Sequence, residues 1–196
     1  MPSLLLIDYL DRARSVYQLL QHRPAYTAIE TARLLAIPPR RFAKVVMLRL
    51  DDELTMLVVP AHCCVDTEAV RRACSCQHVE VAGLRYLRAR FPRCEEGAMP
   101  PFGHLFGLRA FSSGLVDDLD IAFKSGAHHE TVVMPISEFH RLAYVEPLPA
   151  CSRPAGRMAP ALMQRRRLQP ATASSRPLPA GHLGTAGWQG RLAGPG

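Results

Sequence analysis

A loop, a strand start and a turn contain the residues of this chain whose types and spacing could do chemistry. The loop spans Gly97–Gly103 and reads Gly-Ala-Met-Pro-Pro-Phe-Gly. Its two prolines fix φ and donate no backbone hydrogen bond, which predicts a stiff segment outside any helix. A residue that precedes a proline is held extended, so we expect the amides of Gly97, Ala98 and Met99 to be free to donate to a ligand. A plain structural turn leading into a strand is the alternative.

The strand start and the turn each contain one of the chain's two lysines, Lys44 and Lys124, among 24 basic residues. Lys44 begins a run of apolar residues, where its compact ammonium could meet a phosphate or simply lie in solvent. The turn reads Lys124-Ser-Gly-Ala-His-His129. Within it Gly126 permits a positive φ, and His128 can donate or accept a hydrogen bond at neutral pH. Ordinary surface residues of a turn are the alternative here.

Cysteine and histidine could instead form a metal site. The candidate ligands lie in His62-Cys63-Cys64 and Cys74-Ser-Cys76-Gln-His78, whose spacing matches no closed zinc pattern. The chain begins without a basic, signal-like segment, so its six cysteines indicate free thiols in a reducing cytoplasm. It also lacks a G-x-S-x-G elbow and the glycine-rich phosphate loops of nucleotide-binding proteins. The motifs therefore indicate no protein nucleophile, metal or cofactor.

Charge divides the 196 residues into two parts. All 17 acidic residues lie within 1–150, so the net charge of +7 comes from the seven arginines of residues 151–196. A neutral folded part argues against a large face for duplex nucleic acid. Because residues 147–196 are rich in Pro, Ala, Gly, Ser and Arg, we expect a folded domain over 1–146 and a disordered tail over 147–196. No segment is long enough and apolar enough to suggest a membrane span.

The apolar pattern predicts helices interleaved with short strands. We expect helices over residues 3–14, 27–36, 66–73, 84–90 and 138–143. Their predicted N-caps include Thr27, Asp66 and Ser137. We expect strands over residues 16–21, 42–50, 54–59, 79–81, 104–111, 116–119, 120–123 and 131–134. Since these elements follow no regular βαβ period, the expected fold is a single α+β domain with a mixed, curled β-sheet flanked by helices.

Taken in this order, the segments resemble the YbaK-type aminoacyl-tRNA deacylases, which include the editing domain of bacterial prolyl-tRNA synthetases and its free-standing relatives. The likeness covers about residues 3–146. The matching motifs are His22-x-Pro24, Thr27-Ala-x-Glu30-x-Ala32, Ala43-Lys44, Gly97-x-x-x-Pro101 followed by Phe102-Gly103, an aspartate near Asp117, and Gly126-x-His128 before the strand at 131–134.

The resemblance implies trans-editing, which is hydrolysis of the ester that joins a wrong, small amino acid to the 3′-terminal adenosine of a tRNA. It implies catalytic roles for Lys44, facing the acceptor end, and for Gly97 and Pro101, whose loop positions the aminoacyl carbonyl. The residues implied to bind the substrate are His22, Ala98, Met99, Phe102, Gly103, Gly126, Ala127 and His128. The implied partner is the tRNA acceptor end, with an aminoacyl-tRNA synthetase as a second candidate, and no metal, cofactor or membrane is implied.

One departure from the family pattern concerns the substrate. Many relatives have Gly-Ser-His where this chain has Gly126-Ala127-His128, so a hydroxyl donor is missing from the turn that limits the size of the amino acid. Two alternatives to a deacylase stay open. One is a non-catalytic module of the same fold that binds aminoacyl-tRNA or a synthetase, and the other is a metalloprotein that uses the cysteines and histidines named above.

Overall fold

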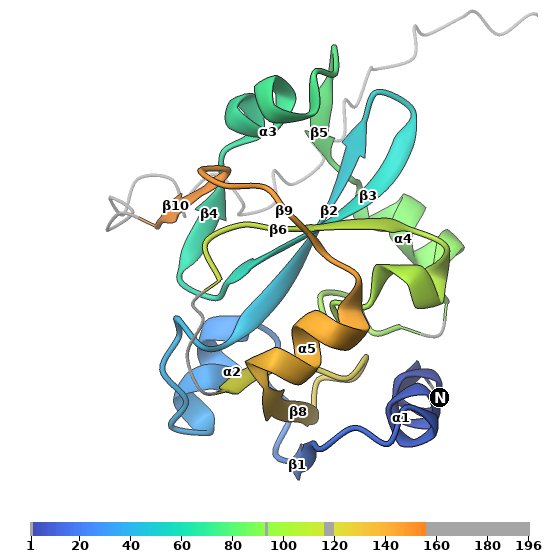
Figure 1. Cartoon of the computed structure of the whole chain (residues 1–196), viewed down its shortest axis with the longest axis vertical. Helices are drawn as coiled ribbons and strands as arrows, with labels where there is room; N and C mark the ends of the chain where they lie inside the picture. The colour runs from blue at the N-terminus through green and yellow to red at the C-terminus, as the bar shows by residue number, and fades with distance from the viewer. Residues whose placement is uncertain (1, 93, 116–119, 156–196) are drawn as a thin grey trace, which may run out of the picture. The chain divides into compact units, whose positions relative to one another are not determined.

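The computed structural model describes residues 2–92, 94–115 and 120–155. Its helices are α1 (Pro2–Arg12), α2 (Ala28–Leu34), α3 (Thr67–Cys74), α4 (Leu84–Arg90), α5 (Ile136–Ala143) and the 3-10 helix η1 (Gly103–Phe106). Its strands are β1 (Gln18–Gln21), β2 (Ala43–Leu50), β3 (Glu53–Pro60), β4 (Cys63–Val65), β5 (Val79–Val81), β6 (Arg109–Ser112), β7 (Asp120–Lys124), β8 (Glu130–Pro135), β9 (Glu146–Pro147) and β10 (Ser152–Pro154) (Figure 1). Helices and strands interleave, which confirms the predicted α+β class.

The strands form three sheets. The largest has the order β5-β2-β3-β6-β9 and is mixed, because β2 pairs antiparallel with β3 and β5 whereas β6 pairs parallel with β3 and β9. A second sheet, β1-β8-β7, is antiparallel, and β10 pairs with β4. A parallel bridge between Phe42 and Ala122 joins the first two sheets just before β2 begins. The predicted mixed sheet is thus confirmed.

The hairpin of β2 and β3 separates two hydrophobic clusters. Met47 lies in a cluster with Phe102 and Phe139, while its neighbour Leu48 lies in another with Phe111. Successive side chains of a strand point to opposite faces, so a strand that is covered on both faces needs apolar residues at nearly every position. This double burial explains the almost uninterrupted apolar run that predicted the hairpin.

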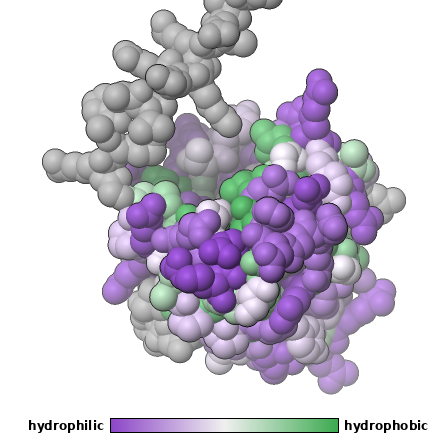
Figure 2. Space-filling model, turned by 90° about the horizontal axis from the view of Figure 1, so that it is seen from above, coloured by the Kyte–Doolittle hydropathy of each residue, from purple (hydrophilic) through white to green (hydrophobic). Residues whose placement is uncertain are grey.

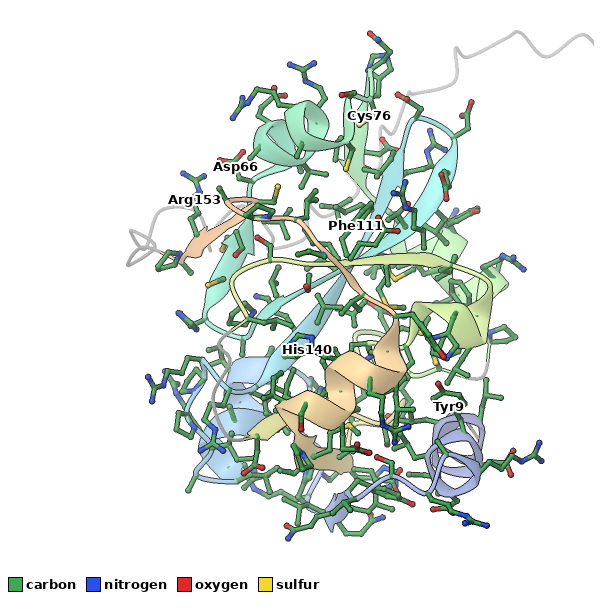
Figure 3. The ribbon with its side chains drawn as sticks, viewed as in Figure 1. Tyr9, Asp66, Cys76, Phe111, His140 and Arg153 are labelled. Atoms are coloured by element: carbon green, nitrogen blue, oxygen red, sulfur yellow. The ribbon has the colours of Figure 1, made fainter. Side chains whose placement is uncertain are left out.

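Helix α1 contributes its apolar side to the first cluster. Leu6 and Leu10 are fully buried there. The hydroxyl of Tyr9 donates to the carbonyl oxygen of Leu142 in α5 over 3.0 Å, and Figure 3 labels Tyr9 on α1. The amphipathic helix predicted at the N-terminus is therefore confirmed, with α5 as one of its partners.

Two of the three predicted helix caps are confirmed. Thr27 accepts a hydrogen bond from the amide of Glu30 over 3.1 Å, and Asp66 caps α3 in the same manner. The prediction for Ser137 is wrong, because α5 begins at Ile136, two residues before the predicted start, and no side chain caps it. Pro135, with φ of −56°, leads from β8 directly into the helix, so Ser137 lies inside the first turn.

The strand predicted over residues 104–111 is wrong in its first half. Residues Gly103–Phe106 form η1, and Gly107 ends this helix with φ of +66°, a conformation that glycine adopts at little cost. Strand β6 begins only at Arg109. A short apolar run does not distinguish helix from strand by its periodicity, which is why the sequence pattern failed here. The strand predicted over 116–119, with Asp117, lies outside the described residues.

The folded chain extends beyond the boundary that was expected at residue 146. Strand β9 pairs with β6, and β10 pairs with β4. Between these strands Leu148 and Cys151 are buried in the second hydrophobic cluster. The Pro- and Ser-rich composition concealed these two apolar side chains, so residues 147–155 belong to the fold rather than to a tail. The predicted disorder of residues 156–196 lies outside the described residues.

One face of the described part is mostly polar. Figure 2 shows a largely hydrophilic face on which hydrophobic side chains form small, separate patches. Within the described ranges, no helix combines the length and apolar character needed to cross a membrane.

Candidate functional site

The first half of the predicted loop is shaped by one internal hydrogen bond. Gly97 has φ of +77°, and the amide of Ala98 donates to the carbonyl oxygen of Glu95 over 2.9 Å. The expectation that three consecutive amides are free is therefore wrong for Ala98, whose side chain is also fully buried. The amides of Gly97 and Met99 have no hydrogen-bond partner among the described residues. Two amides, rather than three, remain to donate to a ligand.

The second half of the loop is an anchor in the core. Pro100 and Pro101 are buried, and the ring of Phe102 contacts the rings of Phe123 and Phe139 at centroid distances of 5.6 and 5.8 Å. Gly103 is buried as well, and a Cβ atom there would lie 2.7 Å from a backbone oxygen. These residues hold the loop, and a direct contact of Phe102 or Gly103 with a substrate stays a prediction.

The predicted turn at Gly126–His128 meets the loop at Glu95. The amide of Glu95 donates to the carbonyl oxygen of Gly126 over 3.1 Å, and its carboxylate accepts a short hydrogen bond from the amide of His128. Gly126 has φ of +124°, which disfavours any other residue at that position. Two of the three predicted segments are thus joined by a pair of hydrogen bonds to one residue. We call this contact the Glu95 joint.

The turn also contains a buried ammonium. Lys124 ends β7 and is 4 % exposed. Its Nζ donates to the carbonyl oxygen of Ala25 over 2.7 Å and lies 3.1 Å from Nδ1 of His128. Burial lowers the pKa of Lys124 to about 8, an effect that the carboxylates of Glu30 and Glu95 oppose. Burial and the adjacent ammonium also lower the pKa of His128.

His22 connects the turn with β1. Its amide donates to the carbonyl oxygen of His129 over 2.9 Å, and its Nε2 lies 2.9 Å from Oγ1 of the buried Thr131. Its ring is thus fixed by β8, and its backbone by the turn. His22 therefore contacts the end of the turn and the start of β8, and its contact with a substrate stays a prediction.

Lys44 lies apart from the joint. Its Nζ donates to the carbonyl oxygen of Ala61 over 3.1 Å, and its charge partly opposes the rise that burial causes in the pKa of Cys63. Among the described residues, no hydrogen bond links Lys44 to the loop or to the turn. Its neighbour Val45 does line a pocket together with Gly97. The half-buried ammonium uses one acceptor, so it retains protons for another.

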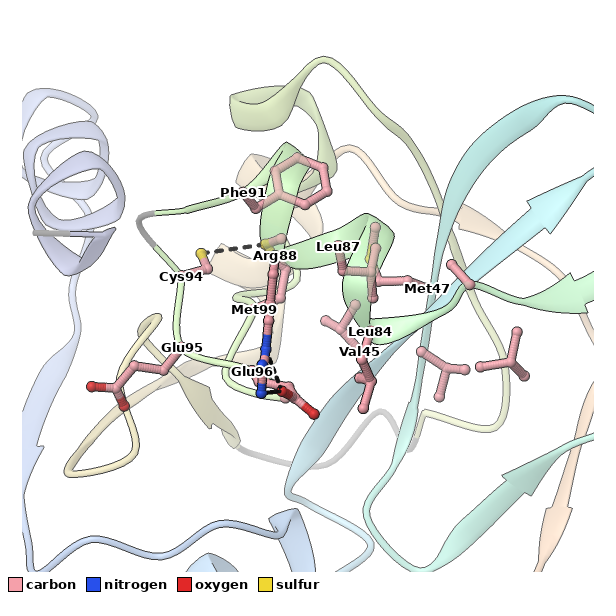
Figure 4. Close-up of a pocket in the computed structure, with 14 residues that line it drawn as sticks. Val45, Met47, Leu84, Leu87, Arg88, Phe91, Cys94, Glu95, Glu96 and Met99 are labelled. Carbon is pink, nitrogen blue, oxygen red and sulfur yellow. Dashed lines mark hydrogen bonds and ion pairs between the residues drawn. The ribbon is translucent and has the colours of Figure 1, made fainter. Parts of the chain in front are cut away.

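The pocket beside the loop is apolar, with an ion pair at one side. It has a volume of about 200 Å³ and lies between β2, α4 and the loop (Figure 4). The side chain of Met99 enters its wall, with Sδ 3.6 Å from Sγ of Cys94. Arg88 and Glu96 form an ion pair of 2.6 Å at this wall. The pocket can accept an apolar group, and the loop amides lie along the same segment.

The cysteines and histidines do not form a metal centre in the described part of the chain. No group of three or more His, Cys, Asp or Glu side chains is arranged there to hold a metal ion. Cys63 lies beside His62 at 3.6 Å, whereas Cys74 and Cys76 pack against the second hydrophobic cluster. The geometry therefore gives no support to the metalloprotein alternative.

The part of the chain that matches a known protein family includes both the loop and the turn. A family model described as the aminoacyl-tRNA editing domain matches residues 22–142, which is more than half of the chain. The chain belongs to this family. The match includes Lys44, Gly97 and His128, so each of the three chemically interesting segments lies inside the editing domain. A search of curated proteins gave no match.

Solved structures share the fold of this editing domain at low sequence identity. A candidate trans-editing enzyme for prolyl tRNA synthetase superposes with a TM-score of 0.65 at 16% identity, over 79% of this chain and 98% of that chain. The hypothetical protein APE2540 gives 0.66 at 13% identity, over 76% and 99%. A candidate signal transduction protein from Marinobacter aquaeolei gives 0.58 at 15% identity, over 74% of this chain and 29% of that chain. These likenesses establish the fold, and the family model establishes the editing domain.

One participant in the site, Glu95, does not stand out in the sequence, and the contacts of a second, Lys124, do not follow from it. Glu95 was not singled out, since it is one of two adjacent acids whose partner lies in another segment. Lys124 stands out in the sequence as one of two lysines and as the first residue of the candidate turn, but its contact with His128 does not follow from the sequence. The spacing of Lys124 and His128 across a glycine turn was the available signal, because a tight turn brings such residues back together.

Proposed function

We propose that this editing domain is a trans-editing aminoacyl-tRNA deacylase that hydrolyses the ester of a tRNA charged with a wrong, small amino acid. The observation that carries the proposal is the Glu95 joint, which holds the Gly97 loop against the turn at Gly126–His128. A reaction at an ester needs the carbonyl and the attacking water to be held in one geometry. A loop that is anchored in the core and tied to a second segment supports this requirement.

Ester hydrolysis also needs a place for developing negative charge. Water adds to the carbonyl carbon, the ester bond to the ribose oxygen breaks, and that oxygen takes up a proton as the amino acid leaves. The amides of Gly97 and Met99, for which the described residues provide no acceptor, are suited to donate to the oxyanion, and one such donor contributes about 3 kcal/mol to transition-state stabilisation. The neighbouring ribose hydroxyl can orient the water, so the proposal requires no protein nucleophile.

Cations near the turn are suited to the phosphates of an acceptor end. Arg23 and Arg33 line a shallow hollow with Thr27 and Glu30, and Arg23 lies two residues before Ala25, whose carbonyl oxygen accepts from Lys124. Both guanidinium groups are exposed, and neither has an ion-pair partner among the described residues. Lys44, with one acceptor, is the third candidate for a phosphate contact. We therefore propose the tRNA acceptor end as the partner, with a synthetase as a second candidate.

The test is a panel of mischarged tRNAs, with small amino acids first, and two substitutions at Lys44. We expect the wild-type protein to accelerate deacylation, Lys44→Met to lose most of that activity, and Lys44→Arg to retain part of it. Arg49→Met is the matched control, because Arg49 lies on the same strand and forms an exposed ion pair with Glu80. Deacylation no faster than in buffer, or full activity in Lys44→Met, would reject the proposal.

A non-catalytic module that binds aminoacyl-tRNA is the alternative. It would use the same cations, so binding alone does not separate the two functions. If charged tRNA binds with a salt-dependent affinity that falls in Arg23→Ser and Arg33→Ser while its ester half-life is unchanged, the binding module is favoured. A shortened half-life for one class of amino acid favours the deacylase.

A further inference from the structure

Lys124 is the most unusual ionisable side chain of the described part, because its ammonium is enclosed. The residue is 4 % exposed and follows the core residue Phe123 on β7. A buried ammonium is costly unless its protons are accepted by other groups. Two of them have acceptors here, the carbonyl oxygen of Ala25 at 2.7 Å and Nδ1 of His128 at 3.1 Å.

The carboxylates that act on this contact come from α2 and from the loop. Glu30 on α2 and Glu95 in the loop favour the charged form of Lys124, whereas burial disfavours it and lowers the pKa to about 8. The pKa of His128 is lowered by burial and by Lys124, with partial opposition from Glu95 and from the carbonyls of Ala25 and Glu96. Because the pKa of Lys124 stays at about 8, its ammonium is retained at neutral pH, and the lowered pKa of His128 leaves the facing imidazole uncharged.

This arrangement restricts the position of the imidazole proton. An ammonium carries only donors, so Nδ1 of His128 must present its lone pair to Lys124. A neutral imidazole with an unprotonated Nδ1 carries its proton on Nε2. The ring of Tyr26 packs on the imidazole at a centroid distance of 4.8 Å, which limits rotation of the ring. The Nε2 proton is then a fixed donor in the turn that the Glu95 joint ties to the loop.

We propose that Lys124 is a positioning residue that keeps His128 in its Nε2–H tautomer, so that the turn presents a hydrogen-bond donor next to the Gly97 loop. An Nε2–H donor recognises an oxygen acceptor, such as the carbonyl or hydroxyl oxygen of an aminoacyl ester. It supplies a donor at the turn where Ala127 has no hydroxyl. Its use by a substrate rests on the proposed function, whereas the tautomer itself does not.

The test is nitrogen NMR of the full-length protein labelled with ¹⁵N-histidine. Long-range proton–nitrogen spectra at pH 7 identify the protonated ring nitrogen, and the signals of His128 are assigned by their loss in His128→Gln. We expect an unprotonated Nδ1 and a protonated Nε2 in the wild type. In Lys124→Met, which removes the charge, we expect a mixture of tautomers and a titration of His128 that is shifted to higher pH.

Ser125→Ala is the matched control. Ser125 is fully buried next to Lys124 and donates to the carboxylate of Glu130 over 2.6 Å, so its loss disturbs the same strand end without removing the ammonium. The tautomer of His128 should be unchanged in this variant. An Nδ1–H tautomer in the wild type, or identical tautomer populations and titration in Lys124→Met, would overturn the proposal.

A second measurement covers the case in which Lys124→Met does not fold. Raising the pH of the wild-type protein above about 9 converts Lys124 into an amine, which can accept a proton as well as donate one. The Nε2–H preference of His128 should then weaken, and a tautomer population that stays constant from pH 7 to pH 9.5 contradicts the proposal. In deacylation assays, Lys124→Met should lower kcat more than it raises KM. Absence of deacylation in the wild type, with the predicted tautomer present, would reject the proposed function and leave this inference standing.

Discussion

The carboxylate of Glu95 accepts a hydrogen bond from the backbone amide of His128, a residue 33 positions further along the chain. The amide of Glu95 returns a hydrogen bond to the same turn through the carbonyl oxygen of Gly126. A loop that is stiff on its own, because of its prolines, is thereby fixed relative to a second segment. The joint accounts for the proximity of two motifs that are separate in the sequence.

Removal of the Glu95 carboxylate should loosen the loop more than it destabilises the fold. In Glu95→Ala we expect faster hydrogen exchange at the amides of Gly97 and Met99 and a loss of deacylation of about 100-fold, since small displacements at a reacting centre are costly. The unfolding free energy should fall by no more than about 3 kcal/mol, the upper value for a hydrogen bond to a charged group. Exchange followed by mass spectrometry and single-turnover assays measure the two effects.

Glu96→Ala is the control for this substitution. Glu96 pairs with Arg88, whose side chain is largely exposed, and such pairs contribute at most about 1 kcal/mol. If Glu96→Ala and Glu95→Ala change loop exchange equally, the joint is not what holds the loop.

Because of Lys124, the unfolding free energy of the protein should rise as the pH increases from about 8 to 10.5. Its folded pKa of about 8 lies below the ordinary value of 10.5, so the unfolded chain binds more protons between these values and stability rises with pH. The full contribution corresponds to about 3 kcal/mol, at about 1.4 kcal/mol for each pKa unit. Denaturant unfolding at pH 8 and pH 10.5 should show this rise in the wild type relative to Lys124→Met. Cysteine and tyrosine side chains also titrate in this pH range, but they contribute equally to both proteins, so the comparison cancels their effect. Parallel profiles of stability against pH would argue against a buried ammonium.

His104 should make the fold sensitive to acid. Its half-buried ring contacts those of Tyr9 and Tyr144 at centroid distances of 5.0 and 4.9 Å. Burial lowers its pKa, with partial opposition from the carbonyl of Ala143, so the unfolded chain protonates first as the pH falls below about 6.5. Stability should therefore decline below that pH.

The substitution His104→Phe keeps an aromatic ring in this cluster and removes the titration. We expect a smaller fall in melting temperature between pH 7 and pH 5 than in the wild type. His78→Gln, at an exposed position, should behave like the wild type. An unchanged acid dependence in His104→Phe would show that other groups cause it.

A protein truncated after residue 155 should be more stable than one truncated after residue 146. A protein ending at 155 keeps Leu148, buried with Phe111, and the hydrogen bond from the amide of Asp66 to the carbonyl of Cys151. A protein ending at 146 loses both, and exposing one buried leucine costs about 2 kcal/mol. Thermal unfolding of the two proteins measures the difference, with Leu148→Ala in the full chain as a control. Equal melting temperatures would show that residues 147–155 do not stabilise the fold and that the domain ends at residue 146.

The sequence predicted local features well and pairings poorly. The cap at Thr27 and the hairpin of β2 and β3 follow from neighbouring residues, and both are confirmed. The 3-10 helix before Gly107 was mistaken for a strand, because its apolar residues suit either element. The Glu95 joint and the contact of Lys124 with His128 depend on which turn meets which loop, and local pattern contains no such information.

The pairing of β1 with β8 has a consequence for how the protein folds. Gln21 donates to the carboxylate of Glu130, a residue 109 positions later. Among the described strands, β1 pairs with β8 alone, so it has no partner until β8 is present. Bringing the two ends of so long a segment together costs conformational entropy. Only contacts that form late in folding offset this cost. During synthesis the candidate site, which needs β7, β8 and the turn between them, cannot assemble until almost the whole domain has emerged. A ribosome-bound chain that ends before residue 120 should therefore contain a stable hairpin of β2 and β3 but no capacity to bind charged tRNA.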